Sequence, residues 1–239
     1  MFINIIDILK NNVKVCRSKI AFEDEERTVS WGEVDEVSDI IAKNILDLGY
    51  KKGSHIGILG ENSIEWAQIF LGILKAGVVP VLLNINLKEC EIVKIAKHCD
   101  VEVIFYNKGF EFIKDQADRL IKTIEFSKIM SRLGSTFEIE KVQIGPSDTA
   151  CIILTSGSTA MPKAVMLSHE NIISNTVSIV KALHWNSDDR MCICVPMFHC
   201  FGLTAGLLSG IVSNCCIYIL KRFRSAKTYE AITAKHCNI

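Results

Sequence analysis

Residues 154–165 read Leu154-Thr155-Ser156-Gly157-Ser158-Thr159-Ala160-Met161-Pro162-Lys163-Ala164-Val165. Apolar runs at residues 149–154 and 164–167 flank the hydroxyl-rich part, which predicts a loop between two strands. Small side chains let backbone N–H groups approach a polyphosphate, and Lys163 adds a compact positive charge. The spacing is not that of a Walker motif, and no GxGxxG dinucleotide fingerprint occurs. A Ser- and Thr-rich surface turn stays open as the alternative.

Short apolar runs alternate with amphipathic segments on both sides of this loop. Further strands are expected at residues 55–59, 78–83, 101–106, 190–195 and 216–220. Helices are expected at residues 31–48, 64–75, 90–98, 112–121, 171–183, 203–212 and 226–235. Ser30 and Glu33 form a capping box for the first helix, and Gly49 ends it. The alternation predicts an α/β fold with doubly wound parallel sheets covered by helices, and an apolar sheet edge exposed near Leu220.

Composition excludes several classes of protein. Of the 239 residues, 49% are hydrophobic and 23% are charged, which is typical of a soluble globular protein. The 27 basic and 27 acidic residues cancel, so no basic excess indicates a nucleic-acid or anionic-membrane partner. The ten cysteines are irregularly spaced and favour reduced thiols, and the first residues lack the basic start of a signal peptide. A cytoplasmic location is therefore expected.

The segment from Met191 to Leu220 is apolar enough to raise the question of a membrane span. Its helical piece, residues 203–212, is shorter than the roughly 20 residues that a bilayer requires. Breaks within the segment favour a buried strand, loop, helix and strand instead, and they fall at Pro196, Gly202, Gly206 and Gly210. No membrane span is expected.

The loop closely resembles the phosphate-loop signature of the adenylate-forming superfamily, T/S-S/T-G-S/T-T-G-x-P-K-G. That superfamily includes acyl- and aryl-CoA synthetases, firefly-type luciferases and the adenylation domains of peptide synthetases. Ala160 and Ala164 stand where the family commonly has glycine. The resemblance extends over essentially the whole chain, through family-like segments at residues 28–33, 75–81, 165–171 and 195–202.

The resemblance implies a two-step ligase reaction. A carboxylate attacks the α-phosphate of ATP to give an acyl adenylate and pyrophosphate, and a thiol, usually that of coenzyme A, then displaces AMP. The resemblance implies Lys163 and His199 as catalytic residues, and a tentative Mg²⁺ ligand in Thr155. The residues implied at the ATP phosphates are Thr155, Ser156, Gly157, Ser158, Thr159 and Lys163. Those implied at the acyl pocket are Phe198, His199, Phe201 and Gly202.

The segment around His199 also bears on the substrate. Peptide-synthetase adenylation domains typically have an aspartate at this position, paired with the α-amino group of their substrate. No Asp or Glu occurs between Met191 and Leu220, so a fatty or aryl acid is expected rather than an amino acid. On its own, His199 would also fit a core histidine in an apolar loop.

The resemblance implies a truncated version of the large N-terminal domain of acyl-CoA synthetases. Its first subdomain is expected at about residues 1–183 and the start of the second at about 184–239, with no C-terminal domain. The chain alone is expected to be inactive, and a second polypeptide carrying the missing half is a candidate partner. Three alternatives remain: a non-catalytic nucleotide-binding remnant, an interaction module that dimerises through a sheet edge, and a peptide-synthetase-type fragment.

Overall fold

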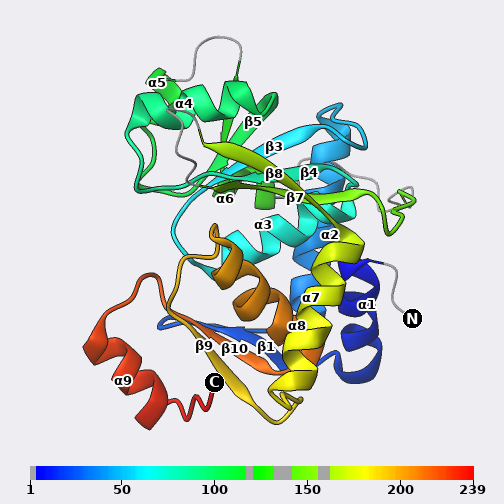
Figure 1. The fold of residues 1–239 in the computed structure, drawn as a ribbon, viewed down its shortest axis with the longest axis vertical. Coiled ribbons are helices and arrows are strands. Elements are labelled where there is room, and N and C mark those ends of the chain that lie inside the picture. Colours follow the sequence, from blue (N-terminus) through cyan, green and yellow to red (C-terminus); the bar gives the residue numbers. More distant parts are fainter. Residues whose placement is uncertain (1–3, 117–120, 132–141, 156–161) are drawn as a thin grey trace. The chain divides into compact units, whose positions relative to one another are not determined.

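The computed structural model describes residues 4–116, 121–131, 142–155 and 162–239 (Figure 1). The residues contact one another mainly within two units. Unit 1 comprises Met1–Glu36, Glu61–Ala67 and His169–Ile239, and unit 2 comprises Val37–Gly60 and Gln68–Ser168. Helices α2 (Trp31–Asp47) and α3 (Ile64–Lys75) contribute residues to both units. The predicted subdomain limit near residue 183 stays a prediction.

Unit 2 contains a six-stranded sheet in the order β6-β5-β3-β4-β7-β8. Its strands are β3 (His55–Leu59), β4 (Val79–Leu82), β5 (Val101–Tyr106), β6 (Lys122–Glu125), β7 (Thr149–Thr155) and β8 (Lys163–Ser168). All neighbouring strands are parallel except β7 and β8, which are antiparallel. Both faces of β4 are buried, as expected for a sheet covered by helices on both sides. The helices wholly within this unit are α4 (Glu89–His98), α5 (Ile113–Gln116) and α6 (Phe126–Met130).

Unit 1 contains a four-stranded sheet in the order β2-β1-β10-β9. Its strands are β1 (Ile20–Glu23), β2 (Thr28–Ser30), β9 (Arg190–Ile193) and β10 (Cys216–Ile219). β1, β10 and β9 are parallel, and β2 is antiparallel to β1. The helices of this unit are α1 (Ile5–Cys16), α7 (His169–Ala182), the π-helix η1 (Gly202–Leu208), α8 (Ser209–Ser213) and α9 (Ser225–Thr233).

Different helices cover the two faces of the unit 1 sheet. Gly206 in η1 lies against Ile193, and Gly210 in α8 lies against Ile217, where an added Cβ would come within 2.4 Å of the isoleucine Cδ1. Because side chains alternate along a strand, the neighbouring residues face the other way. On that second face, Tyr218 packs with Ala231 of α9. Figure 1 shows α9 as the red helix that follows β10 in the chain.

Several sequence-based expectations need correction. Strand β10 is not at a sheet edge, because β1, which periodicity did not reveal, pairs with it. The helix expected at residues 112–121 is only the four-residue α5 within the described residues, and β6 and α6 follow where irregular chain was expected. The expected helix at residues 203–212 begins as a π-helix. Within the described ranges, no helix combines the length and apolar character needed to cross a membrane.

The predicted capping box is confirmed. Glu33 Oε2 accepts hydrogen bonds from the backbone N–H of Ser30 at 2.7 Å and from its hydroxyl at 2.8 Å. In return, the Ser30 hydroxyl accepts from the Glu33 N–H at 3.3 Å. The two bonds from Ser30 lower the pKa of the Glu33 carboxyl. The helix ends before Gly49, whose φ of +91° suits glycine.

We expect Ser30→Ala to lower the free energy of unfolding by about 1 kcal/mol, because the start of α2 loses its cap. Since the folded pKa of Glu33 lies below its unfolded value, its contribution is present above the unfolded pKa and is lost as the pH falls through the folded pKa. Glu33→Gln, which keeps an acceptor oxygen but does not titrate, is the matched control. Urea denaturation from pH 7 to pH 3 measures both effects. Equal pH dependence in Glu33→Gln and the parent would contradict this assignment.

Candidate functional site

The two ends of the predicted phosphate loop lie opposite each other on a hairpin. Thr155 ends β7 and Lys163 begins β8, and the two are cross-strand partners. The Thr155 Oγ1 lies 3.5 Å from the Lys163 carbonyl oxygen, and both residues are exposed. Lys163 opens a strand rather than a helix, which agrees with the absence of a Walker motif. The predicted loop residues Ser156, Gly157, Ser158 and Thr159 lie outside the described residues.

This hairpin begins at the carboxyl edge of the unit 2 sheet. β7 is parallel to β4, and β4 is parallel to β3, so all three strands end at the same edge. In open α/β sheets, ligands bind outside the carboxyl ends of the strands. Thr155 and Lys163 therefore lie at the edge of the sheet where ligands of such sheets bind.

The His199 segment occupies the corresponding edge of the unit 1 sheet. β9 and β10 are parallel, and residues 194–199 follow the carboxyl end of β9. Phe198 is buried, and its ring lies 4.5 Å from the His199 ring, centroid to centroid, at a tilt of 43°. His199 itself is exposed, and Phe201 is 69% exposed. The exposure of His199 removes the core-histidine alternative.

A buried amide, Asn62, holds this segment in place. Its Nδ2 donates to the Val195 carbonyl at 2.8 Å and to the Leu220 carbonyl at 3.2 Å. Its Oδ1 accepts from the Met197 N–H at 2.8 Å. Asn62 is only 5% exposed, so these bonds are shielded from water. One side chain thus joins the loops that follow β9 and β10.

Gly202 fixes the other end of the segment by close backbone packing. A Cβ added there would lie 2.2 Å from the Pro196 carbonyl oxygen, which no side chain can accommodate without moving the loop. The same carbonyl accepts a hydrogen bond from the His199 N–H at 3.1 Å. Gly202 therefore has a structural reason to be glycine, beyond its predicted place at the acyl pocket.

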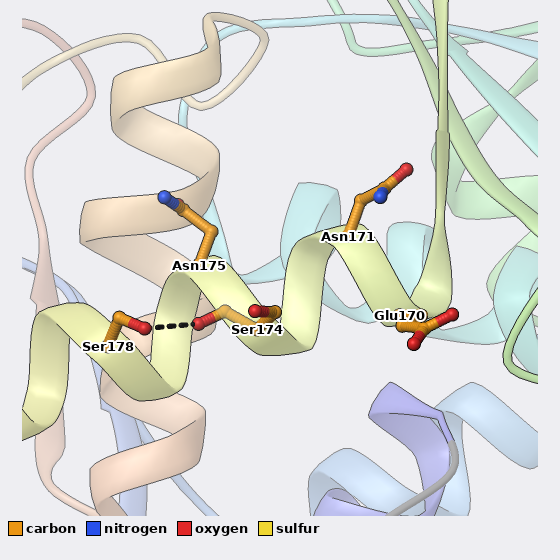
Figure 2. Close-up of a pocket in the computed structure, with 5 residues that line it drawn as sticks. All are labelled: Glu170, Asn171, Ser174, Asn175 and Ser178. Carbon is orange, nitrogen blue, oxygen red and sulfur yellow. Dashed lines mark hydrogen bonds between the residues drawn. The ribbon is translucent and has the colours of Figure 1, made fainter.

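A polar depression lies along α7. It has a volume of about 490 Å³ and is lined by Glu170, Asn171, Ser174, Asn175 and Ser178 (Figure 2). The Ser178 hydroxyl donates to the Ser174 carbonyl at 2.7 Å, so part of the lining is engaged within the helix. The described residues that line it include no cation, which makes them poorly suited to bind phosphate groups. We assign no ligand to it.

The order of motifs along the chain matches a known family. The sequence model of the AMP-binding enzyme family covers residues 9–239. This chain belongs to that family. The chain is 28% identical over 222 residues to 4-coumarate–CoA ligase of Pinus taeda, covering 87% of this chain and 41% of the relative. It is also 28% identical over 224 residues to 2-succinylbenzoate–CoA ligase of Oceanobacillus iheyensis, covering 93% of this chain and 45% of the relative.

Solved structures of AMP-binding proteins share the fold. The o-succinylbenzoate CoA synthetase of Bacillus subtilis, in complex with an acyl-adenylate intermediate, matches with a TM-score of 0.89 at 25% identity, covering 98% of this chain and 60% of that one. The N-terminal domain of FACL13 from Mycobacterium tuberculosis matches with a TM-score of 0.89 at 23% identity, covering 99% and 62%. The chain spans 40–47% of the length of the curated relatives. The predicted N-terminal acyl-CoA synthetase fold is confirmed.

Sequence reasoning missed Asn62. The only signal was a short polar run, Glu61 to Ser63, between an apolar strand and an apolar helix. Ser63 has a local function, because its hydroxyl accepts from the Trp66 N–H at 3.1 Å at the start of α3. The partners of Asn62 lie more than 130 residues further along the chain, and periodicity cannot reveal such a contact.

We expect Asn62→Ala to lower the free energy of unfolding by about 1–3 kcal/mol, because three backbone groups at a largely buried position lose their partner. Hydrogen exchange should show lost protection of the Met197 amide. Asn62→Asp keeps the acceptor for that amide but cannot donate to the two carbonyls, so it should retain part of the protection. Asn186→Ala, which removes an exposed turn acceptor, is the control. Unchanged exchange over residues 195–197 in Asn62→Ala would show that other contacts hold the loop.

Proposed function

We propose that this chain is the N-terminal part of an ATP-dependent, AMP-forming acid–thiol ligase. It would activate a carboxylate as the acyl adenylate and pass the acyl group to coenzyme A. The main support is the family match over residues 9–239, together with the ordered phosphate-loop run that Thr155 and Lys163 bracket. The relatives include ligases that are named for coenzyme A and a carboxylic acid.

In this proposal, the hairpin between β7 and β8 holds the ATP phosphates. Lys163 would offset the charge of the β- and γ-phosphates, and hydroxyls of residues 155–159 would donate to their oxygens. The fit rests on the exposed placement of Thr155 and Lys163 at the carboxyl edge of a parallel sheet. Thr155 could supply one oxygen ligand to Mg²⁺, which would neutralise phosphate charge when bound. A lone hydroxyl does not make a magnesium site, so carboxylate ligands must come from other residues.

His199 would lie beside the reacting carboxylate. It is exposed on a loop that Asn62 and Gly202 fix, so it can meet a ligand without reorganising the loop. Phe198 packs against its ring, and Phe201 offers an exposed apolar surface for the acyl group. The lack of acidic residues between Met191 and Leu220 supports a fatty or aryl acid over an α-amino acid.

This chain alone would not complete the reaction. In-line attack at the α-phosphorus needs adenine and ribose to be fixed and further charges to oppose the phosphates. Those groups are not matched in the 239 residues. A second polypeptide or a longer chain would supply them. A non-catalytic nucleotide-binding remnant is the competing function, and it predicts no acid-dependent chemistry in any such assembly.

The first test is ATP–pyrophosphate exchange with a panel of fatty and aryl acids. We expect the purified 239-residue chain to show no acid-dependent exchange, because positioning groups act together and the loss of several leaves little rate enhancement. Exchange should appear when the chain is extended with the rest of the protein or assayed with a polypeptide that carries it. Robust exchange by the chain alone would contradict the proposal that it lacks groups that the reaction needs. Absence of exchange by the completed protein would favour the competing function, a non-catalytic nucleotide-binding remnant.

A second test changes Lys163 in the completed protein. We expect Lys163→Ala to raise the KM for ATP by about 10- to 100-fold, because a charge-assisted phosphate contact contributes about 1.5–3 kcal/mol. Lys181→Ala, on the exposed surface of α7, is the matched control and should leave the KM unchanged. An unaltered KM and turnover in Lys163→Ala would remove the lysine from the phosphate site.

A further inference from the structure

The helix that follows the His199 segment begins with a widened turn. η1 is a π-helix, in which a backbone N–H bonds to the carbonyl five residues earlier instead of four, and such turns are frequent at functional sites. The Ser209 N–H shows this pattern, since it donates to the carbonyls of Thr204 and Gly206. η1 starts directly after Phe201, the exposed aromatic residue of the proposed acyl site. The backbone of η1 therefore bears on where that ring lies.

One side of η1 is closely packed within unit 1. Leu203 and Leu207 are fully buried, and Gly206 lies against Ile193 of β9, where an added Cβ would come within 3.3 Å of the isoleucine Cδ1. Phe201 lies outside this buried face. Because protein interiors are densely packed, the buried side of η1 has little room to move. The orientation of the Phe201 ring then depends on the peptide group that precedes it.

Thr204 restrains that peptide group. Its hydroxyl donates to the Cys200 carbonyl at 2.8 Å, and this carbonyl belongs to the peptide group whose N–H is that of Phe201. The neighbouring His199 carbonyl accepts from the Leu203 N–H at 2.9 Å. Thr204 is buried, so water competes little for its hydroxyl bond. The Thr204 hydroxyl thus restrains the backbone between the two exposed side chains of the proposed acyl site.

Ser209 in turn restrains Thr204. Its hydroxyl donates to the Thr204 carbonyl at 2.8 Å, and Ser209 is fully buried. Hydroxyl bonds of this kind compete with the regular backbone bonding of a helix and often bend it. Two of them follow each other along η1, from Ser209 to Thr204 and from Thr204 to Cys200. Since both residues are buried and both hydroxyls donate to the backbone, they can influence a ligand only through the exposed side chains before η1.

We propose that Thr204, supported by Ser209, is a positioning residue for acyl-group specificity, because its hydroxyl bond holds Phe201 in one orientation. This inference rests on the proposed function, in which Phe201 contacts the acyl group. An apolar ring held in one orientation accepts some acyl shapes and excludes others, whereas a ring that can reorient adapts to many. Loss of the Thr204 hydroxyl therefore brings the kcat/KM values of different acids closer together.

The first measurement is hydrogen exchange of the purified 239-residue chain. Thr204→Val removes the hydroxyl and keeps a branched side chain of similar size, whereas Thr204→Ser keeps the hydroxyl. We expect exchange over residues 200–205 to be about two- to tenfold faster in Thr204→Val, the effect of one lost hydrogen bond, and close to the parent in Thr204→Ser. Ser213→Ala is the matched control, because this buried serine donates to the Gly210 carbonyl, outside η1. Exchange at the parent rate in Thr204→Val would overturn the proposal.

The second measurement is the acid selectivity of the completed protein in ATP–pyrophosphate exchange. We expect the ratio of kcat/KM between the best and the poorest acid of a fatty and aryl panel to fall about tenfold in Thr204→Val, with the KM for ATP unchanged. Ser209→Ala should lower the ratio in the same direction. Thr204→Ser should restore the ratio of the parent, and Ser213→Ala should leave it unchanged.

The outcomes separate this inference from the proposed function. If Thr204→Val loses the same fraction of activity with every acid, or keeps the ratio of an active parent, the role of Thr204 is structural only and this inference alone is wrong. A parent that shows no exchange with any acid would instead overturn the proposed function, and this inference with it.

Discussion

The amide of Asn62 is the interaction on which the His199 segment depends. It donates to two carbonyls and accepts from one N–H, and an amide side chain is suited to do both at a single buried position. The carbonyls belong to Val195 and Leu220, just beyond parallel strands, so the amide fixes two loops at one sheet edge. The neighbouring Glu61 forms an ion pair with Lys221, with 2.8 Å between Oε2 and Nζ. Because Lys221 is exposed to solvent, this ion pair contributes less to stability than the buried hydrogen bonds of Asn62. Local order at this edge thus rests on neutral hydrogen bonds.

Sequence patterns predicted the fold best where burial is complete. β3, β5 and α3 were placed at their observed bounds, because continuous apolar runs between glycines and polar turns leave little ambiguity. β1 and β2 are four and three residues long and were missed, since so short a strand has no measurable period. The π-helix was also missed, because an apolar helical pattern does not distinguish a π-helix from an α-helix.

The candidate site was predictable to the extent that its chemistry lies in consecutive residues. Thr155 and Lys163 were predicted from the order of residues in the loop and its family resemblance, and in the structure the two are cross-strand partners. His199 was predicted as a site residue from the resemblance of its segment, whereas its exposure and its ring contact with Phe198 could be seen only in the structure. Asn62 contacts parts of the chain that are distant in the sequence. Such contacts are determined by how β9 and β10 are placed, and no local pattern encodes that placement.

The anchoring of His199 bears on how it could act. Asn62 holds the chain before His199, and the contact of Gly202 with the Pro196 carbonyl holds it after. A loop fixed at both ends loses little conformational entropy when a ligand binds, so its orientation adds to affinity and rate at low cost. His199→Ala would then remove one side chain and leave the backbone of the loop in place. A substitution of Asn62 would instead make the backbone at Val195 and Met197 more mobile. In the proposed function, this difference would separate a residue that contacts substrate from one that positions it.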